Sequence, residues 1–175
     1  MKKKMIGNLD GDKVIVTDPD SKAQLVQRHF GEKHLKFLVL DYYEALYLSE
    51  QDSLEIKFNN KKISTEKFIE LILKKQSKSY HMHRFSVYKD LRSKGYIIKT
   101  GLKFGFDFRI YPKGKKVEES HTQFVIDVLP ESEKLTNQKI AKSVRMATGL
   151  HTKLIIAIVD NELDISYYEI NRVKF

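Results

Sequence analysis

The chain has 175 residues and a net charge of +9, and 41% of its residues are hydrophobic. This content is sufficient for one large or two small globular domains, and the excess of Lys and Arg favours a polyanionic partner, with a merely soluble lysine-rich protein as the alternative. Because the chain has no cysteine, disulfide frameworks, thiolate zinc sites and cysteine nucleophiles are excluded.

The N-terminus is basic but lacks the apolar core of a signal peptide, and no run approaches about 18 apolar residues. We therefore expect a soluble cytoplasmic protein with no membrane association. The charge is uneven: residues 1–80 carry 15 basic against 12 acidic side chains, whereas residues 81–175 carry 17 against 11. Most of the basic excess thus lies in the second half.

Residues 1–80 are predicted to form a small mixed α/β domain. Residues 7–11 carry turn chemistry, Asp20 or Ser21 can cap the first helix, and Asp41 can cap the second. The expected elements are a strand over 13–18, a helix that ends near Gly31, a strand over 35–40, a helix over 42–51, a hairpin over 54–63 with Asn59-Asn60 as its turn, and a helix over 66–76. Since no side chains here stand at a spacing that indicates chemistry, we expect a scaffold.

The polar run over residues 74–79 is the best candidate for a domain boundary, so that residues 81–175 form a second domain. Its expected elements are a helix that ends at Gly95, strands over 96–100, 104–111 and 122–129, a helix over 137–149 capped by Thr136, an almost continuously apolar strand over 153–160, an acidic turn over 160–164 and a final strand over 165–173. This order predicts a mixed central sheet flanked by helices, and hence an α/β fold, α+β overall.

Two titratable side chains lie near strand ends in the second half. Tyr111 closes a strand just before the turn formed by Pro112 and the residues after it, and His121 opens the next apolar run ten residues on. A phenol and an imidazole are thereby expected at neighbouring strand ends in a basic setting. By residue type alone, such a Tyr is usually an amphipathic packing residue and such a His is usually incidental.

The second half resembles the archaeal-type tRNA-splicing endonucleases, also called tRNA-intron endonucleases, in their short homo-oligomeric form. The resemblance rests on VYKDLRSKGYIIKTGLKFGFDFRIYPKG, on His121 before an apolar strand, and on the Arg145 helix leading into KLIIAIVDNELDISYY. GDKVIV, RHFG and EALYL are similar to the family's smaller N-terminal domain. The resemblance implies RNA cleavage without metal or cofactor, in which a ribose 2′-hydroxyl attacks and leaves a 2′,3′-cyclic phosphate and a 5′-hydroxyl.

Such a reaction needs a base, an acid and a fixed cation beside the phosphorane. The resemblance implies that Tyr111 is the base and His121 the acid, although the two roles could be exchanged, since a free phenol has a pKa of about 10. The ungapped counterpart of the family lysine is Thr152. A one-residue slip gives this role to Lys153, and Lys142 is the fallback.

The resemblance also implies the substrate, a bulge-helix-bulge in precursor tRNA, with Arg145 stacking on a bulged base. Two cuts at fixed separation imply a homo-oligomer, with a homotetramer expected and a homodimer as the alternative. In the tetrameric form an acidic loop docks onto a basic surface of another subunit, and Asp160, Glu162 and Asp164 match the position of that loop. The competing interpretation of Arg145 is an ordinary charge on a helix surface, and that of the acidic residues is a solvated turn.

Two other functions remain open at this stage. A metal-dependent restriction-type DNA nuclease would use Asp107, Glu118 and Asp127 to hold Mg²⁺, but the lysine expected two positions after Asp127 is Leu129 instead. A non-catalytic RNA-binding or structural subunit of a splicing endonuclease would lack the Tyr, His and Lys residue types, all of which are present.

Overall fold

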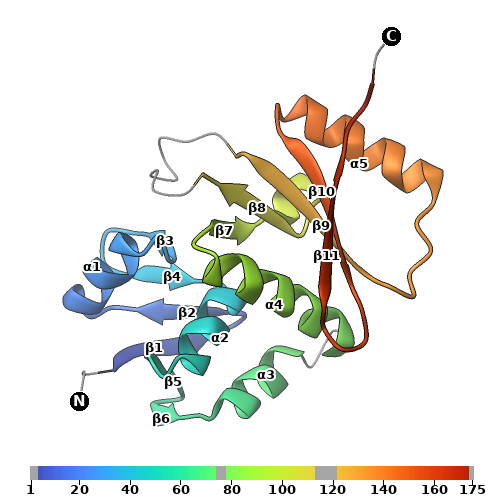
Figure 1. Ribbon diagram of the computed structural model, residues 1–175. Coiled ribbons are helices and arrows are strands. Elements are labelled where there is room, and N and C mark those ends of the chain that lie inside the picture. Colours follow the sequence, from blue (N-terminus) through green and yellow to red (C-terminus); the bar gives the residue numbers. More distant parts are fainter. Residues whose placement is uncertain (1–3, 74–77, 113–121, 174–175) are drawn as a thin grey trace. The chain divides into compact units, whose positions relative to one another are not determined.

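The computed structural model describes residues 4–73, 78–112 and 122–173. It comprises two compact units, Met1–Ser77 and Lys78–Phe175 (Figure 1). Each unit combines helices with one mixed β-sheet, which confirms the predicted α/β fold class. None of the helices within the described ranges is both long and apolar enough to cross a membrane.

The first unit is built on a sheet with strand order β3-β4-β2-β1-β5-β6. Its central strand β1 runs parallel to β5 and antiparallel to β2. The elements are β1 (Met5–Asp10), β2 (Lys13–Val16), α1 (Pro19–Gln27), β3 (Glu32–Lys33), β4 (Leu38–Leu40), α2 (Tyr42–Glu50), β5 (Leu54–Phe58), β6 (Lys61–Lys62) and α3 (Thr65–Leu73).

Strand β1 corrects one expectation, because most of the turn predicted over residues 7–11 is strand. Gly7 lies inside β1. Glycine is needed at this position because a Cβ atom would collide with the side chain of Val14 on the neighbouring strand. Only Gly11, with φ of +60°, has the left-handed backbone of a turn. A glycine that permits close packing between strands was thus mistaken for a turn residue.

The local signals in the rest of this unit largely behave as predicted. Asp41 caps α2 in a capping box: its side chain accepts from the Glu44 N–H at 2.8 Å, and Glu44 accepts from the Asp41 N–H at 3.1 Å. Asn59 and Asn60 both have positive φ, as a two-residue hairpin turn requires. The cap of α1 was misplaced, since Asp18 caps this helix.

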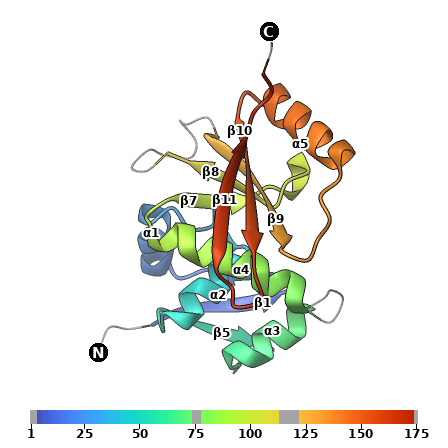
Figure 2. The same ribbon diagram turned by 45° about the vertical axis from the view of Figure 1, so that its right-hand side comes forward.

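The second unit has strand order β11-β10-β9-β8-β7, in which β9 and β10 are parallel and the other pairs are antiparallel. Helices α4 and α5 cover its two opposite faces (Figures 1 and 2). The elements are α4 (Lys78–Ser93), β7 (Ile97–Thr100), the short 3₁₀ helix η1 (Leu102–Phe104), β8 (Phe108–Tyr111), β9 (Phe124–Pro130), α5 (Asn137–Gly149), β10 (Lys153–Val159) and β11 (Ile165–Ile170).

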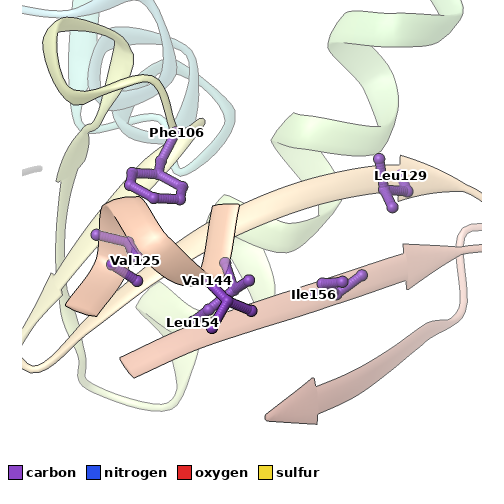
Figure 3. Packing of buried hydrophobic residues seen from close by; sticks show 7 residues of the cluster. Phe106, Val125, Leu129, Val144, Leu154 and Ile156 are labelled. Atoms are coloured by element: carbon purple, nitrogen blue, oxygen red, sulfur yellow. The ribbon is translucent and has the colours of Figure 1, made fainter. Parts of the chain in front are cut away.

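The α5 face carries one apolar cluster of this unit (Figure 3). Its buried members come from the turn before β8, from β9, α5 and β10: Phe106, Val125, Leu129, Val144, Ala147, Leu154 and Ile156. On the opposite face, the Tyr167 hydroxyl of β11 donates to Asp90 Oδ2 of α4 at 2.7 Å. The two faces can therefore be told apart residue by residue along each strand.

Strand β8 is shorter than the predicted 104–111. The residues before it form η1, which ends at Gly105 with φ of +80°. Gly101 is needed at the start of this turn, because a Cβ there would lie 2.9 Å from the carbonyl oxygen of Phe106. Apolar residues alternate through this segment as they do in a strand. The chain nevertheless turns here, because Gly101 and Gly105 permit the turn.

Candidate active site

Three strand ends meet at one edge of the second sheet. Ile110, near the end of β8, is in register with Phe124 at the start of β9, and Phe124 is in register with Lys153 at the start of β10. The Gln123 N–H donates to the Ile110 carbonyl at 2.8 Å, and the Lys153 N–H donates to the Gln123 carbonyl at 3.4 Å. Tyr111 and Lys153 are thus brought to the same edge, two strands apart.

Tyr111 is the last residue of β8 and is only 5% exposed. It is in register with Ile97 of β7. Side chains alternate along a strand, so Tyr111 and Arg109 lie on the same face of the sheet, and Arg109 Cζ is 5.8 Å from the centre of the Tyr111 ring. Burial and the neighbouring strand hold this ring in place.

His121 lies outside the described residues. The described chain resumes at Thr122, and the next residue, Gln123, is bonded to the carbonyl of Ile110, the residue before Tyr111. Only covalent connectivity therefore relates His121 to this edge of the sheet.

Lys153 begins β10, and 57% of its side chain is exposed. Its ammonium lies 3.1 Å from Glu169 Oε1 on β11. Hydrogen bonds from Asn171 and from Lys153 hold the pKa of the Glu169 carboxyl below its ordinary value. The described contact of the Lys153 side chain is thus with β11.

The strand register places Lys153 and Tyr111 on opposite faces of the sheet. Arg109 is in register with Val125, and Val125 with Leu154, so these residues share the α5 face. Tyr111 belongs to this face by alternation from Arg109, whereas Lys153 precedes Leu154 and points to the α4 face. The structure therefore brings the two residues to one edge without placing them on one face.

The other residues considered for the cation and for RNA contact lie on or after α5. Lys142 and Arg145 are exposed on this helix. Thr152, which precedes β10, has a buried hydroxyl for which the described residues provide no hydrogen-bond partner. A shift of one residue along a strand reverses the face of a side chain, so Thr152 and Lys153 are not equivalent positions.

The guanidinium of Arg109, which the sequence pattern did not indicate, lies near Tyr111. Its Nε–H donates to the Thr100 carbonyl at 3.3 Å, and its Cζ lies 4.5 Å from the centre of the Phe104 ring. The guanidinium is thus next to two aromatic rings, those of Phe104 and Tyr111. The available signal was the spacing in FRIY, since residues two apart in a strand share a face.

The carboxylates that a metal-dependent nuclease would use have protein partners. Asp107 accepts from Arg84 Nε and from the Val128 N–H, both at 2.7 Å, and Asp127 accepts from Ser143 Oγ at 2.9 Å. Glu118 lies outside the described residues. Across the described ranges, no three His, Asp or Glu side chains form a group that could hold a metal ion.

The acidic turn between β10 and β11 is organised by its first residue. Asp160 Oδ1 accepts from the N–H groups of Glu162 and Asp164 at 2.8 and 2.9 Å. Leu163 between them has φ of +69° and is partly exposed. The side chain of Asp160 thus shapes the turn, while Glu162 and Asp164 contribute backbone N–H groups to it.

Comparison with known families now identifies the chain's relatives. Residues 5–69 match the tRNA intron endonuclease N-terminal domain, and residues 81–167 match the tRNA intron endonuclease catalytic C-terminal domain. The chain belongs to the tRNA intron endonuclease family. The matched segments fall in the two structural units, and the second contains Tyr111, Arg109 and Lys153.

Relatives in this family match the chain over nearly its whole length. A tRNA-splicing endonuclease of Thermococcus gammatolerans is 37% identical over 95% of this chain and 97% of its own. Those of Methanococcus vannielii and Methanothermobacter thermautotrophicus are 34% and 32% identical, over 99% and 94% of this chain and 97% and 95% of their own. The similarity thus includes both units.

Proposed function

We propose that this chain is a tRNA-intron endonuclease that cuts precursor tRNA at bulge-helix-bulge splice sites. Family membership over both units supports an endonuclease acting on RNA. The observation that carries the proposal is the edge of the second sheet, where the end of β8 and the starts of β9 and β10 meet in one register. This edge joins Tyr111 to the strand that follows His121 in the chain.

In the proposed reaction the ribose 2′-hydroxyl attacks the adjacent phosphorus and the bond to the 5′-oxygen breaks. The products are a 2′,3′-cyclic phosphate and a 5′-hydroxyl. Tyr111, as the phenolate, takes the proton of the 2′-hydroxyl, and His121, as the imidazolium, gives a proton to the leaving 5′-oxygen. If the roles are exchanged, a neutral His121 is the base and the Tyr111 phenol is the acid. Negative charge that grows on the phosphorane oxygens requires a fixed cation, which Lys153 or a neighbouring basic side chain supplies, and no metal takes part.

Chain connectivity supports the pairing of Tyr111 with His121. Consecutive Cα atoms are about 3.8 Å apart, so His121 is tied within two peptide units of Gln123. The Gln123 N–H donates to the carbonyl of the residue before Tyr111 at 2.8 Å. A fixed phenol and a tethered imidazole are the two groups that acid–base cleavage of RNA requires.

The substrate and assembly follow from the same proposal. Arg145 is exposed on α5 and is proposed to stack its guanidinium on a bulged base. Two cuts at a fixed separation require two copies of the site, which a homotetramer supplies. The acidic turn with Asp160, Glu162 and Asp164 is proposed to dock onto a basic surface of another subunit, and the cytoplasm is the proposed location.

A cleavage assay on a bulge-helix-bulge RNA in EDTA tests the proposal. We expect the wild type to produce cyclic-phosphate and 5′-hydroxyl ends, and we expect His121→Ala to remove nearly all cleavage. Tyr111→Phe should lower the single-turnover rate constant about 100- to 10,000-fold, as loss of a general base does, with RNA affinity nearly unchanged. The control is His34→Ala, which removes an imidazole from the first unit.

Three outcomes would contradict this assignment. Loss of wild-type cleavage in EDTA would indicate a metal-dependent nuclease. Full activity of His121→Ala would remove the proposed acid. Equal losses of RNA binding and cleavage in Tyr111→Phe would make this ring a contact or packing residue.

A further inference from the structure

A cation on the same side of the sheet as Tyr111 can share a phosphate with its hydroxyl most directly. Side chains on opposite faces are separated by the thickness of the backbone layer, and Lys153 begins on the α4 face. Its ammonium is also paired with Glu169, 3.1 Å away. The position of Lys153 therefore does not place a positive charge beside the Tyr111 ring.

Arg109 and Lys99 are the basic side chains that the register puts on this face near Tyr111. Arg109 precedes Tyr111 by two residues, and Lys99 of β7 is in register with Arg109. A backbone carbonyl and two aromatic rings contact Arg109. Arg109 Nε donates to a β7 carbonyl, and its guanidinium lies 4.5 Å from the Phe104 ring centre and 5.8 Å from that of Tyr111.

The guanidinium of Arg109 retains donors for an anion. Within the described contacts only its Nε–H has a hydrogen-bond acceptor, so the four N–H groups of its terminal nitrogens have no acceptor among the described residues. A planar guanidinium presents two parallel N–H bonds, a geometry that matches two oxygens of one phosphate. The ring of Phe104, which is 40% exposed, lies next to the guanidinium and restrains it.

We propose that Arg109 contacts the scissile phosphate and stabilises the charge that develops on its non-bridging oxygens. This inference rests on the proposed function, and it assigns Arg109 as the fixed cation of that reaction. Two rings and one carbonyl already hold Arg109 in position. Its side chain therefore loses little conformational entropy when it binds the transition state. Lys153 then links the start of β10 to the end of β11 through its ion pair with Glu169.

Single-turnover cleavage by four variants tests this assignment at saturating protein. We expect Arg109→Gln to lower the cleavage rate constant about 100- to 1,000-fold, the effect of removing one transition-state donor. Arg109→Lys keeps the charge without the planar pair of donors and should recover part of this loss. Lys99→Gln removes the same charge from the same face and should stay within about threefold of the wild type. Lys153→Gln tests the alternative cation on the other face, and its loss should be smaller than that of Arg109→Gln.

A substrate with sulfur in place of a non-bridging oxygen of the scissile phosphate separates phosphate contact from packing. One stereoisomer should slow the wild type, and this difference should disappear in Arg109→Gln if the guanidinium touches that oxygen. Thermal melts of all variants show whether Arg109→Gln is folded. If it is not, the sulfur effect is compared between the wild type and Arg109→Lys instead.

Several results would overturn the inference. Near wild-type cleavage by Arg109→Gln, a large loss confined to Lys153→Gln, or an unchanged sulfur effect in Arg109→Gln would each remove the assigned role. If the wild type and Lys99→Gln cleave and the Arg109 variants cleave equally well, the inference fails while the proposed function stands. If the wild type does not cleave, both fail.

Discussion

At the scale of single residues, Asp127 is a partly buried carboxyl with a defined effect on stability. Burial raises its pKa above the ordinary value of 3.8, the hydrogen bond from Ser143 opposes this rise, and the negative charge of Asp107 adds to it. Between the ordinary and the raised pKa the folded state holds a proton that the unfolded chain has released. Stability contributed by this group therefore falls as pH rises through that window.

We predict that Asp127→Asn is more stable than the wild type at neutral pH, because it removes a partly buried charge and keeps an acceptor for Ser143 Oγ. The advantage should shrink as pH falls towards 3.8 and below, where the wild-type carboxyl is protonated. Urea unfolding midpoints measured from pH 3 to 7 check this. Ser143→Ala is the matched control: it should destabilise the wild type at neutral pH. Lower stability of Asp127→Asn throughout would contradict the prediction.

The candidate site could be predicted in part. Tyr111 was placed correctly at a strand end, since FRIY alternates and Pro112 follows it. The sequence could not predict which face of the sheet Lys153 occupies. That face depends on the register between β9 and β10, which are joined through α5 and share no local turn. Arg109 was missed for a related reason: its importance depends on the ring of Phe104, which packs there only because η1 turns the chain.

At the scale of elements, helix α5 shows how far local chemistry determines boundaries. The predicted range over 137–149 is confirmed, because Thr136 Oγ1 accepts from the Lys139 N–H at 3.2 Å and begins the helix. In β1 a tertiary contact overrides the local pattern, because Gly7 packs against Val14. In α1 the error is local, since the cap is Asp18 and not the predicted Asp20 or Ser21. Caps and amphipathic faces are local signals, whereas close approach between strands is not.

We predict that Thr136→Ala lowers the free energy of unfolding by about 1 kcal/mol, since it leaves an N–H group at the start of α5 without its acceptor. Thr136→Ser should retain most of the stability. Denaturant titrations measure both. Thr148→Ala is the comparison within the same helix: its hydroxyl donates to the Val144 carbonyl, which the helix already engages, so a small effect is expected. Equal losses at both positions would refute the capping role.

At the scale of the whole molecule, the proposed assembly depends on charge more than on the shape of the acidic turn. Asp160 accepts the two N–H groups that organise this turn, whereas Glu162 and Asp164 supply backbone donors and leave their carboxylates outward. Their charges can therefore be removed without removing the bonds that hold the turn. Salt should weaken a contact of this kind, since the Debye length falls to about 3 Å at 1 M.

We predict that Glu162→Gln combined with Asp164→Asn shifts the protein from a tetramer to smaller species, in the same direction as high salt acts on the wild type. Sedimentation velocity at several protein concentrations measures the change. Asp10→Asn with Asp12→Asn removes two charges, one at the end of β1 and one in the turn after it, and is the control. An unchanged mass for the Glu162 and Asp164 double variant would exclude this turn as the contact.

The hydrogen bond between Tyr167 and Asp90 has a kinetic consequence. It joins groups 77 residues apart in the chain and fastens β11 to the first helix of its unit. The entropy lost in closing a segment grows with its length, and each doubling adds about 0.6 kcal/mol. We therefore expect β11 to dock on α4 late in the folding of this unit, at rates between those of helical bundles and all-β sandwiches.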